Sequence, residues 1–152
     1  MKLAEALTER AALSRRLQEL RDRILRNAKY QEGDTPAEAP NTLLKEYDKT
    51  AKAFSKLVVK INQTNNAIQL DNGVSMIEAL AQRDNLKLKH SLYTRLAAEA
   101  TPTFNRYSKT EIKFVSSVTV IDIQKSADKL AKEYRILDGK IQQANWTHDL
   151  IE

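Results

Sequence analysis

Two short phrases of this 152-residue sequence each occur twice, and the distances between their copies constrain the fold more than any other feature. The phrase KINQTN at 60–65 returns as KIQQAN at 140–145, an offset of 80 residues. The phrase AEALTERAAL at 4–13 returns as IEALAQRDNL at 77–86, an offset of 73 residues. Neither phrase belongs to a catalytic or cofactor motif. They therefore predict a duplicated structural unit, with pseudo-repeats at 1–66 and 75–150.

The spacing of apolar residues predicts that each copy is a pair of helices. Between residues 2 and 27 they recur as on one face of a helix, at Leu3, Ala6, Leu13, Leu17, Leu20 and Ile24; Arg10 takes the position between Ala6 and Leu13, so the series keeps a spacing of three and four. Similar faces predict helices over 41–65, from Ser75 onward, and over about 122–146. With only three glycines and three prolines, the composition also favours helices. We expect a mainly α fold in one domain, 1–152: an antiparallel four-helix bundle built from a duplicated hairpin.

The connection between the third and fourth helices should differ from the rest of the chain. The two offsets differ by seven residues, so this connection should be longer than its counterpart in the first hairpin. Ile112, Phe114, Val118 and Val120 nearly alternate with polar residues, and β-branched residues are dense up to residue 123. This pattern predicts a short β segment over 111–121, which we expect to pair with the loop at 28–32.

The sequence shows no set of residues suited to catalysis or to holding a cofactor. There is no cysteine, and neither His90 nor His148 has the glutamate three residues earlier that di-iron bundles use. Gly-rich phosphate loops and the HExxH zinc motif are also missing. We therefore expect a protein that is not an enzyme and that needs no cofactor or metal.

Four polar residues are candidates for a shared site, because each has an identical counterpart at the matching position of the other repeat. Arg10 and Arg83 fall at core-type positions near the starts of their helices, and Asn65 and Asn145 fall near the ends of theirs. In antiparallel hairpins helix starts lie beside helix ends, so the four could form one polar layer. Such a layer fixes helix register; alternatively, two guanidinium groups could hold an anion or a small ligand. We prefer the structural interpretation.

The third helix carries a second apolar stripe that predicts an interface. Its candidate residues are Ile77, Leu88, Leu92 and Leu96. A stripe of this kind exposed to water marks a contact surface, so we expect a homo-oligomer or an unidentified protein partner. The alternative is that the 101–120 connection covers the stripe within one chain.

Charge and hydropathy limit the other partners. The net charge of +5 and pI near 9.4 permit binding to nucleic acid, but the basic residues are interleaved with acidic ones, as in 15–26. Nucleic acid is thus an alternative and not the expected partner. No stretch reaches the ~18 apolar residues of a membrane-spanning helix, and the start lacks the apolar run of a signal peptide. We expect a cytoplasmic protein.

Several phrases in order along the chain carry a family resemblance: INQTN, EALAQRD, RYSKTEIK and QQANW. Together with the first 40 residues they make the sequence resemble the bacterial septicolysin-like family. The resemblance implies a small, mostly helical bacterial protein, and its label implies a cytolysin. The expected function is accordingly a non-enzymatic helical bundle that self-associates or binds a protein, with a membrane-active, pore-forming protein as the first alternative and an RNA- or DNA-binding protein as the second.

Overall fold

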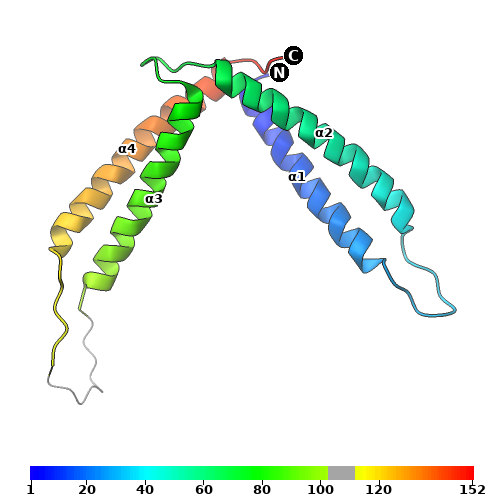
Figure 1. Cartoon of the computed structure of the whole chain (residues 1–152), viewed down its shortest axis with the longest axis horizontal. Helices are drawn as coiled ribbons and strands as arrows, with labels where there is room; N and C mark the ends of the chain where they lie inside the picture. Colours follow the sequence, from blue (N-terminus) through cyan, green and yellow to red (C-terminus); the bar gives the residue numbers. More distant parts are fainter. Residues whose placement is uncertain (103–111) are drawn as a thin grey trace. The chain divides into compact units, whose positions relative to one another are not determined.

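The computed structural model describes residues 1–102 and 112–152, and these contain four α-helices (Figure 1). They are α1 (Leu3–Arg26), α2 (Pro40–Ala67), α3 (Met76–Ala100) and α4 (Val120–Thr147). Within the described residues the only β-type pairing is two isolated bridges. The mainly α fold class with four helices is confirmed. The start and end expected for α1, α2 and α4 lie within two residues of those observed.

The chain divides into two compact units, each built on a helical hairpin. Unit 1 comprises Met1–Ile68 and Gln143–Glu152, and unit 2 comprises Gln69–Gln142. Unit 1 therefore holds α1, α2 and the last turns of α4, and unit 2 holds α3 and the rest of α4. Within each hairpin the two helices run antiparallel, side by side (Figure 1). The packing of both hairpins into one four-helix bundle stays a prediction.

The hairpin of unit 1 is held by a seam of apolar residues with the spacing of a coiled coil. Buried and half-buried positions follow one another at intervals of three and four residues, interrupted on α1 by the exposed Arg10, and this spacing keeps one line of side chains facing the partner helix. On α1 these positions are Leu3, Ala6, Leu13, Leu17, Leu20 and Ile24; on α2 they are Leu43, Tyr47, Thr50, Phe54, Leu57, Ile61 and Thr64.

Unit 2 has a seam of the same kind, in which Arg83 and His90 stand among the apolar residues of α3. Its members are Ala79, Arg83, Leu86, His90, Tyr93 and Ala97 on α3, and Ile123, Ala127, Leu130, Tyr134, Leu137 and Ile141 on α4. Adding 73 to the α1 seam positions from Ala6 onward gives seam positions of α3, as with Leu13 and Leu86. Adding 80 to the α2 seam positions up to Ile61 gives those of α4, as with Leu57 and Leu137. The two hairpins thus share one seam register.

The last residues of the chain complete unit 1 by pairing with its first residues. The Leu3 amide donates to the His148 carbonyl at 3.0 Å, and the Leu150 amide donates to the Met1 carbonyl at 2.8 Å. The Ile151 amide donates to the buried Thr64 hydroxyl at 3.0 Å. An ion pair of 3.0 Å between Lys2 Nζ and Asp149 Oδ1 adds to this junction. Both chain ends therefore lie together in unit 1 (Figure 1).

A tight turn over residues 70–74 leads into α3. Asn72 Oδ1 accepts a hydrogen bond from the Val74 amide at 3.2 Å, and the Leu70 amide donates to the Val74 carbonyl at 2.8 Å. Gly73 has a φ of +78°, a conformation that side chains with a Cβ rarely adopt. The Ser75 hydroxyl then accepts from the Glu78 amide at 3.2 Å and caps the first turn of α3.

The predicted β segment is wrong in the part that the structure describes. Residues 112–119 form no strand, nor do residues 28–32, and 120–123 already belong to α4; residue 111 lies outside the described residues. The Ser116 hydroxyl bonds both to the Val118 carbonyl and to its amide, which makes a turn immediately before the helix. A strand needs a partner for its backbone groups, and an alternating pattern in one segment cannot supply one.

Candidate functional site

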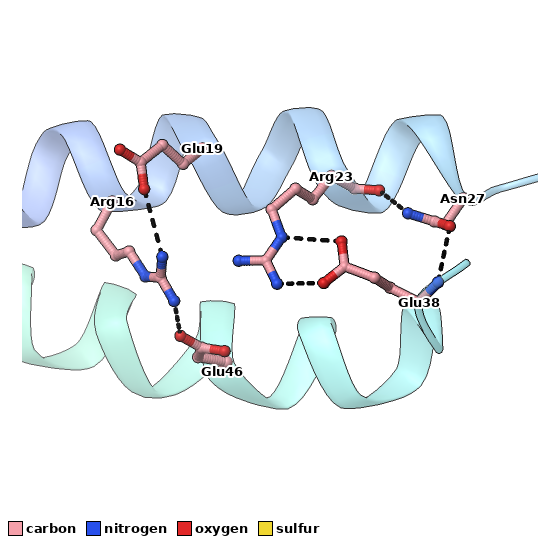
Figure 2. Close-up of polar contacts among 6 residues, drawn as sticks. All are labelled: Arg16, Glu19, Arg23, Asn27, Glu38 and Glu46. Atoms are coloured by element: carbon pink, nitrogen blue, oxygen red, sulfur yellow. Dashed lines mark hydrogen bonds and ion pairs between the residues drawn. The ribbon is translucent and has the colours of Figure 1, made fainter. Parts of the chain in front are cut away.

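Charged side chains join α1 to α2 in unit 1, toward the end of the hairpin where the connecting loop lies (Figure 2). Arg16, on α1, donates from Nη1 to Glu19 Oε2 on the same helix at 3.3 Å. Its second terminal nitrogen, Nη2, donates to Glu46 on α2. One guanidinium group therefore bridges a carboxylate within its own helix and another on the neighbouring helix.

Arg23, two helical turns further along α1, makes the stronger connection. Its Nε donates to Glu38 Oε2 at 3.0 Å and its Nη2 donates to the other carboxylate oxygen, a two-pronged pairing. Asn27 extends the contact, because its Nδ2 donates to the Arg23 carbonyl at 2.8 Å and its Oδ1 accepts from the Glu38 amide at 3.0 Å (Figure 2). Asn27 follows α1 and Glu38 precedes α2, so these bonds hold both ends of the loop.

These six residues, Arg16, Glu19, Arg23, Asn27, Glu38 and Glu46, are called the hairpin-end network below. The hydrogen bond from Arg23 holds the pKa of Glu38 below its ordinary value, and the hydrogen bond to Glu46 is the main cause that raises the pKa of Arg16. A hollow beside the network is lined by α1 residues alone and opens to solvent. With the Glu38 carboxylate ionised and paired at neutral pH, the network serves to set the ends of the hairpin.

We expect acid to weaken the hairpin-end network. The pKa of Glu38 is lowered in the folded chain, so its contribution to stability is complete above its unfolded pKa and is lost as the pH falls through the folded pKa. The pKa of Asp149, lowered mainly by its hydrogen bond with Lys2, acts in the same direction. The midpoint of thermal unfolding, measured from pH 6 down to pH 3, should fall, and Glu38→Gln should reduce that fall.

Glu32→Gln is the matched control for this measurement, because Glu32 is an exposed acid in the same loop. It should leave the pH profile of the natural sequence unchanged. A Glu38→Gln profile that runs parallel to the natural one would show that the pairing with Arg23 contributes nothing to the acid response.

The four residues of the predicted polar layer have different environments. Arg10 is exposed on α1, Asn65 is half-buried near the end of α2, and Asn145 is buried, with 6% of its surface exposed. Arg83 is half-buried in the unit 2 seam, where its Nη1 donates to Asp138 Oδ1 on α4 at 3.1 Å. Arg83 belongs to unit 2 and the other three to unit 1, so the layer itself stays a prediction.

The predicted interface residues on α3 are mostly exposed within the chain. Leu88 is 72% exposed, Leu92 is 64% exposed and Ile77 is 50% exposed, whereas Leu96 is half-buried. The seam residues of the same helix lie on another face, where Ala79 has no exposed surface. α3 thus presents a second apolar line that its own hairpin does not cover.

The sequence holds another repeated motif at the offset of 80 residues, and our sequence reasoning missed it. KEYDKTAK at 45–52 on α2 returns as KSADKLAK at 125–132 on α4. The motif places three lysines at positions i, i+4 and i+7, which is one line along a helix. All of these lysines are exposed: Lys45, Lys49 and Lys52 on α2, and Lys125, Lys129 and Lys132 on α4. Applying the known offset to charged residues, and not only to KINQTN, would have found them.

The described residues hold neither a metal-binding cluster nor a membrane-spanning helix. Residues 1–102 and 112–152 contain no group of three or more His, Asp or Glu side chains placed to hold a metal ion. None of their helices is long and apolar enough to cross a membrane.

Comparisons with known proteins identify a family but no activity. A crystal structure described as a functionally unknown conserved protein from Corynebacterium diphtheriae is similar over 99% of both chains, with 43% sequence identity and a TM-score of 0.93. No curated protein matches the chain. The expected membership of the septicolysin-like family is wrong, because the family model that matches, over residues 10–150, is a different one. The chain belongs to the family of unknown function DUF6847.

Proposed function

We propose that this protein is not an enzyme and acts through self-association, with the second apolar line of α3 as the contact between copies. The line, called the outer stripe below, consists of Ile77, Ala81, Leu88 and Leu92, with Leu96 at its edge. The observation that carries the proposal is the exposure of Leu88 and Leu92, at 72% and 64%. Two adjacent leucines exposed to this degree on a rigid helix favour burial against a protein surface.

Charges beside the outer stripe favour a second copy of the chain as the partner. At 100° per residue, Asp84 and Arg95 lie within roughly 40° of Leu88 around the helix axis. If two α3 helices meet antiparallel about a twofold axis between Leu88 and Leu92, each Leu88 faces the other copy's Leu92. The same arrangement brings Asp84 beside Arg95 of the other copy. Both side chains are exposed, and Asp84 also lies 3.7 Å from Nη2 of its neighbour Arg83.

The proposal predicts that Leu92→Glu yields a monomer, because association would bury an unpaired charge. Light scattering on a size-exclusion column at micromolar concentration measures the mass directly. Leu44→Glu is the matched control: Leu44 is a 44% exposed leucine on α2 that does not belong to the outer stripe, and its replacement should keep the oligomer. A monomeric natural protein, or equal dissociation by Leu44→Glu, would refute the proposal.

A charge exchange tests the antiparallel arrangement itself. Asp84→Arg places like charges opposite each other and should weaken the dimer, and the double change Asp84→Arg with Arg95→Asp should restore it. Restoration by the double change is specific to a contact between these two residues. If the double variant associates no more tightly than Asp84→Arg alone, the two copies contact each other in another arrangement.

We further propose that the two hairpins arose by duplication. The shared seam register at both offsets and the repeated lysine motif support this. Packing as one four-helix bundle in a single domain and a cytoplasmic location stay predictions. The pore-forming alternative rested on the septicolysin-like label, which the family match overturns, so we do not propose it.

A further inference from the structure

The lysines of the repeated motif form two exposed rows, one on α2 and one on α4. The first is Lys45, Lys49 and Lys52 on α2, which Lys56 extends along the same line; the second is Lys125, Lys129 and Lys132 on α4. Within residues 1–102 and 112–152, none of these ammonium groups lies within ion-pair distance of a carboxylate. Each row is therefore a line of positive charge that the described part of the chain leaves unpaired.

We propose that the two lysine rows bind the phosphate backbone of double-stranded nucleic acid without reading its sequence. At a rise of 1.5 Å per residue, the seven residues from the first to the last lysine of a row span about 10 Å. One strand of a duplex carries a phosphate per roughly 3.4 Å of helix axis, so a row covers about as many phosphates as it has lysines. Lysine acts at such sites as a point charge that neutralises a phosphate and releases its counterions.

The surroundings of the rows favour a nucleic-acid backbone over a membrane. A helix that lies on a membrane needs an apolar face free to enter the lipid. The apolar faces of α2 and α4 are already used in the seams, through residues such as Leu57 and Ile141, which are 8% and 1% exposed. Binding lipid through these faces would require the hairpins to come apart, whereas binding a phosphate backbone requires no change.

The same surroundings favour a duplex over a single strand. Proteins that hold single strands stack the bases on aromatic side chains. The aromatic residues nearest the rows in sequence, Tyr47 on α2 and Tyr134 on α4, are half-buried members of the seams. Each row thus offers charge without a stacking surface, which suits the regular exterior of a duplex. Our sequence reasoning disfavoured nucleic acid on the mixed charges of 15–26, a segment of α1 that contains neither row.

The test measures binding of a labelled 20-base-pair DNA duplex by fluorescence anisotropy between 50 and 200 mM salt. The first variant is Lys45→Gln, Lys49→Gln and Lys52→Gln combined. Its control combines Lys29→Gln, Lys87→Gln and Lys89→Gln, which are exposed lysines outside the rows. Each triple variant lowers the net charge from +5 to +2, because three lysines are neutralised. The combined change at Lys125, Lys129 and Lys132 tests the second row in the same way.

We expect each row variant to lose at least tenfold in affinity at 50 mM salt and the control to lose much less. The slope of log affinity against log salt should become shallower by about 2.7 for each row, at roughly 0.9 per phosphate contact. Asp48→Asn, which removes an exposed acid next to Lys49 in the first row, should instead raise the affinity. The proposal is overturned if the natural protein does not bind at 50 mM salt or if row and control variants lose equally. The proposal is also overturned if the row variants bind DNA as well as the natural protein does but no longer bind anionic vesicles. That result would mean that the rows contact a membrane.

Discussion

Replacing Ala79 by Glu should unfold the hairpin of unit 2. Ala79 lies in the seam of α3 and has no exposed surface, so a glutamate there places a carboxylate among apolar side chains. An uncompensated buried charge costs several kcal/mol, which is comparable with the whole stability of a small domain. Far-UV circular dichroism should show loss of much of the helical signal, and limited proteolysis should cut within residues 76–100.

Ala81→Glu is the control for this experiment. It makes the same chemical change two residues further along α3, where Ala81 is exposed on the outer stripe. The helical signal should stay at the level of the natural protein, while the proposed association through the outer stripe should weaken. An Ala79→Glu protein with an undiminished helical signal and unchanged melting would show that the seam does not hold α3 in place.

Replacing Leu20 by Ala should cost unit 1 about 2 to 5 kcal/mol, the range for removing a buried leucine side chain from a packed core. Leu20 has no exposed surface and sits in the α1 seam. The cost combines the lost burial of the removed carbon atoms and the cavity that remains between the helices. Urea unfolding, followed by circular dichroism, should show a lower midpoint with an unchanged slope.

Leu25→Ala provides the comparison, because Leu25 lies on the same helix but is 58% exposed. Its replacement should change the stability by less than about 0.5 kcal/mol, as for most surface substitutions. Equal losses at the two positions would mean that the hairpin is not held by the seam, and that the three-and-four spacing does not report which face is packed.

The helices could be predicted from the sequence because the information for them is local. The seam spacing of α1, the turn at Asp71, Asn72 and Gly73, and the cap at Ser75 each depend on residues a few positions apart. The β segment could not be judged in this way, since a strand exists only if a distant strand supplies its hydrogen bonds. Arg10 shows a finer limit: its position fits the seam, but it is exposed.

The polar contacts were less predictable than the helices. Which acid Arg16 or Arg23 meets depends on how far α2 is displaced along α1, and that displacement follows from the packing of the whole seam and the path of the loop. The lysine rows, by contrast, are a property of single helices and were present in the sequence at an offset already identified. Short phrases such as INQTN and QQANW were too brief to distinguish one family of helical proteins from another.

The pairing of the chain ends has a consequence for the order in which the protein folds during synthesis. Unit 1 needs Gln143–Glu152, which leave the ribosome only after the whole of Gln69–Gln142. At about 5 to 20 residues per second, translation of that stretch takes on the order of 4 to 15 seconds. During this delay the Thr64 hydroxyl lacks its hydrogen bond from the Ile151 amide, and the Leu3 amide lacks the His148 carbonyl as its acceptor. Unit 2 is therefore the first to become complete, although its hairpin is made second.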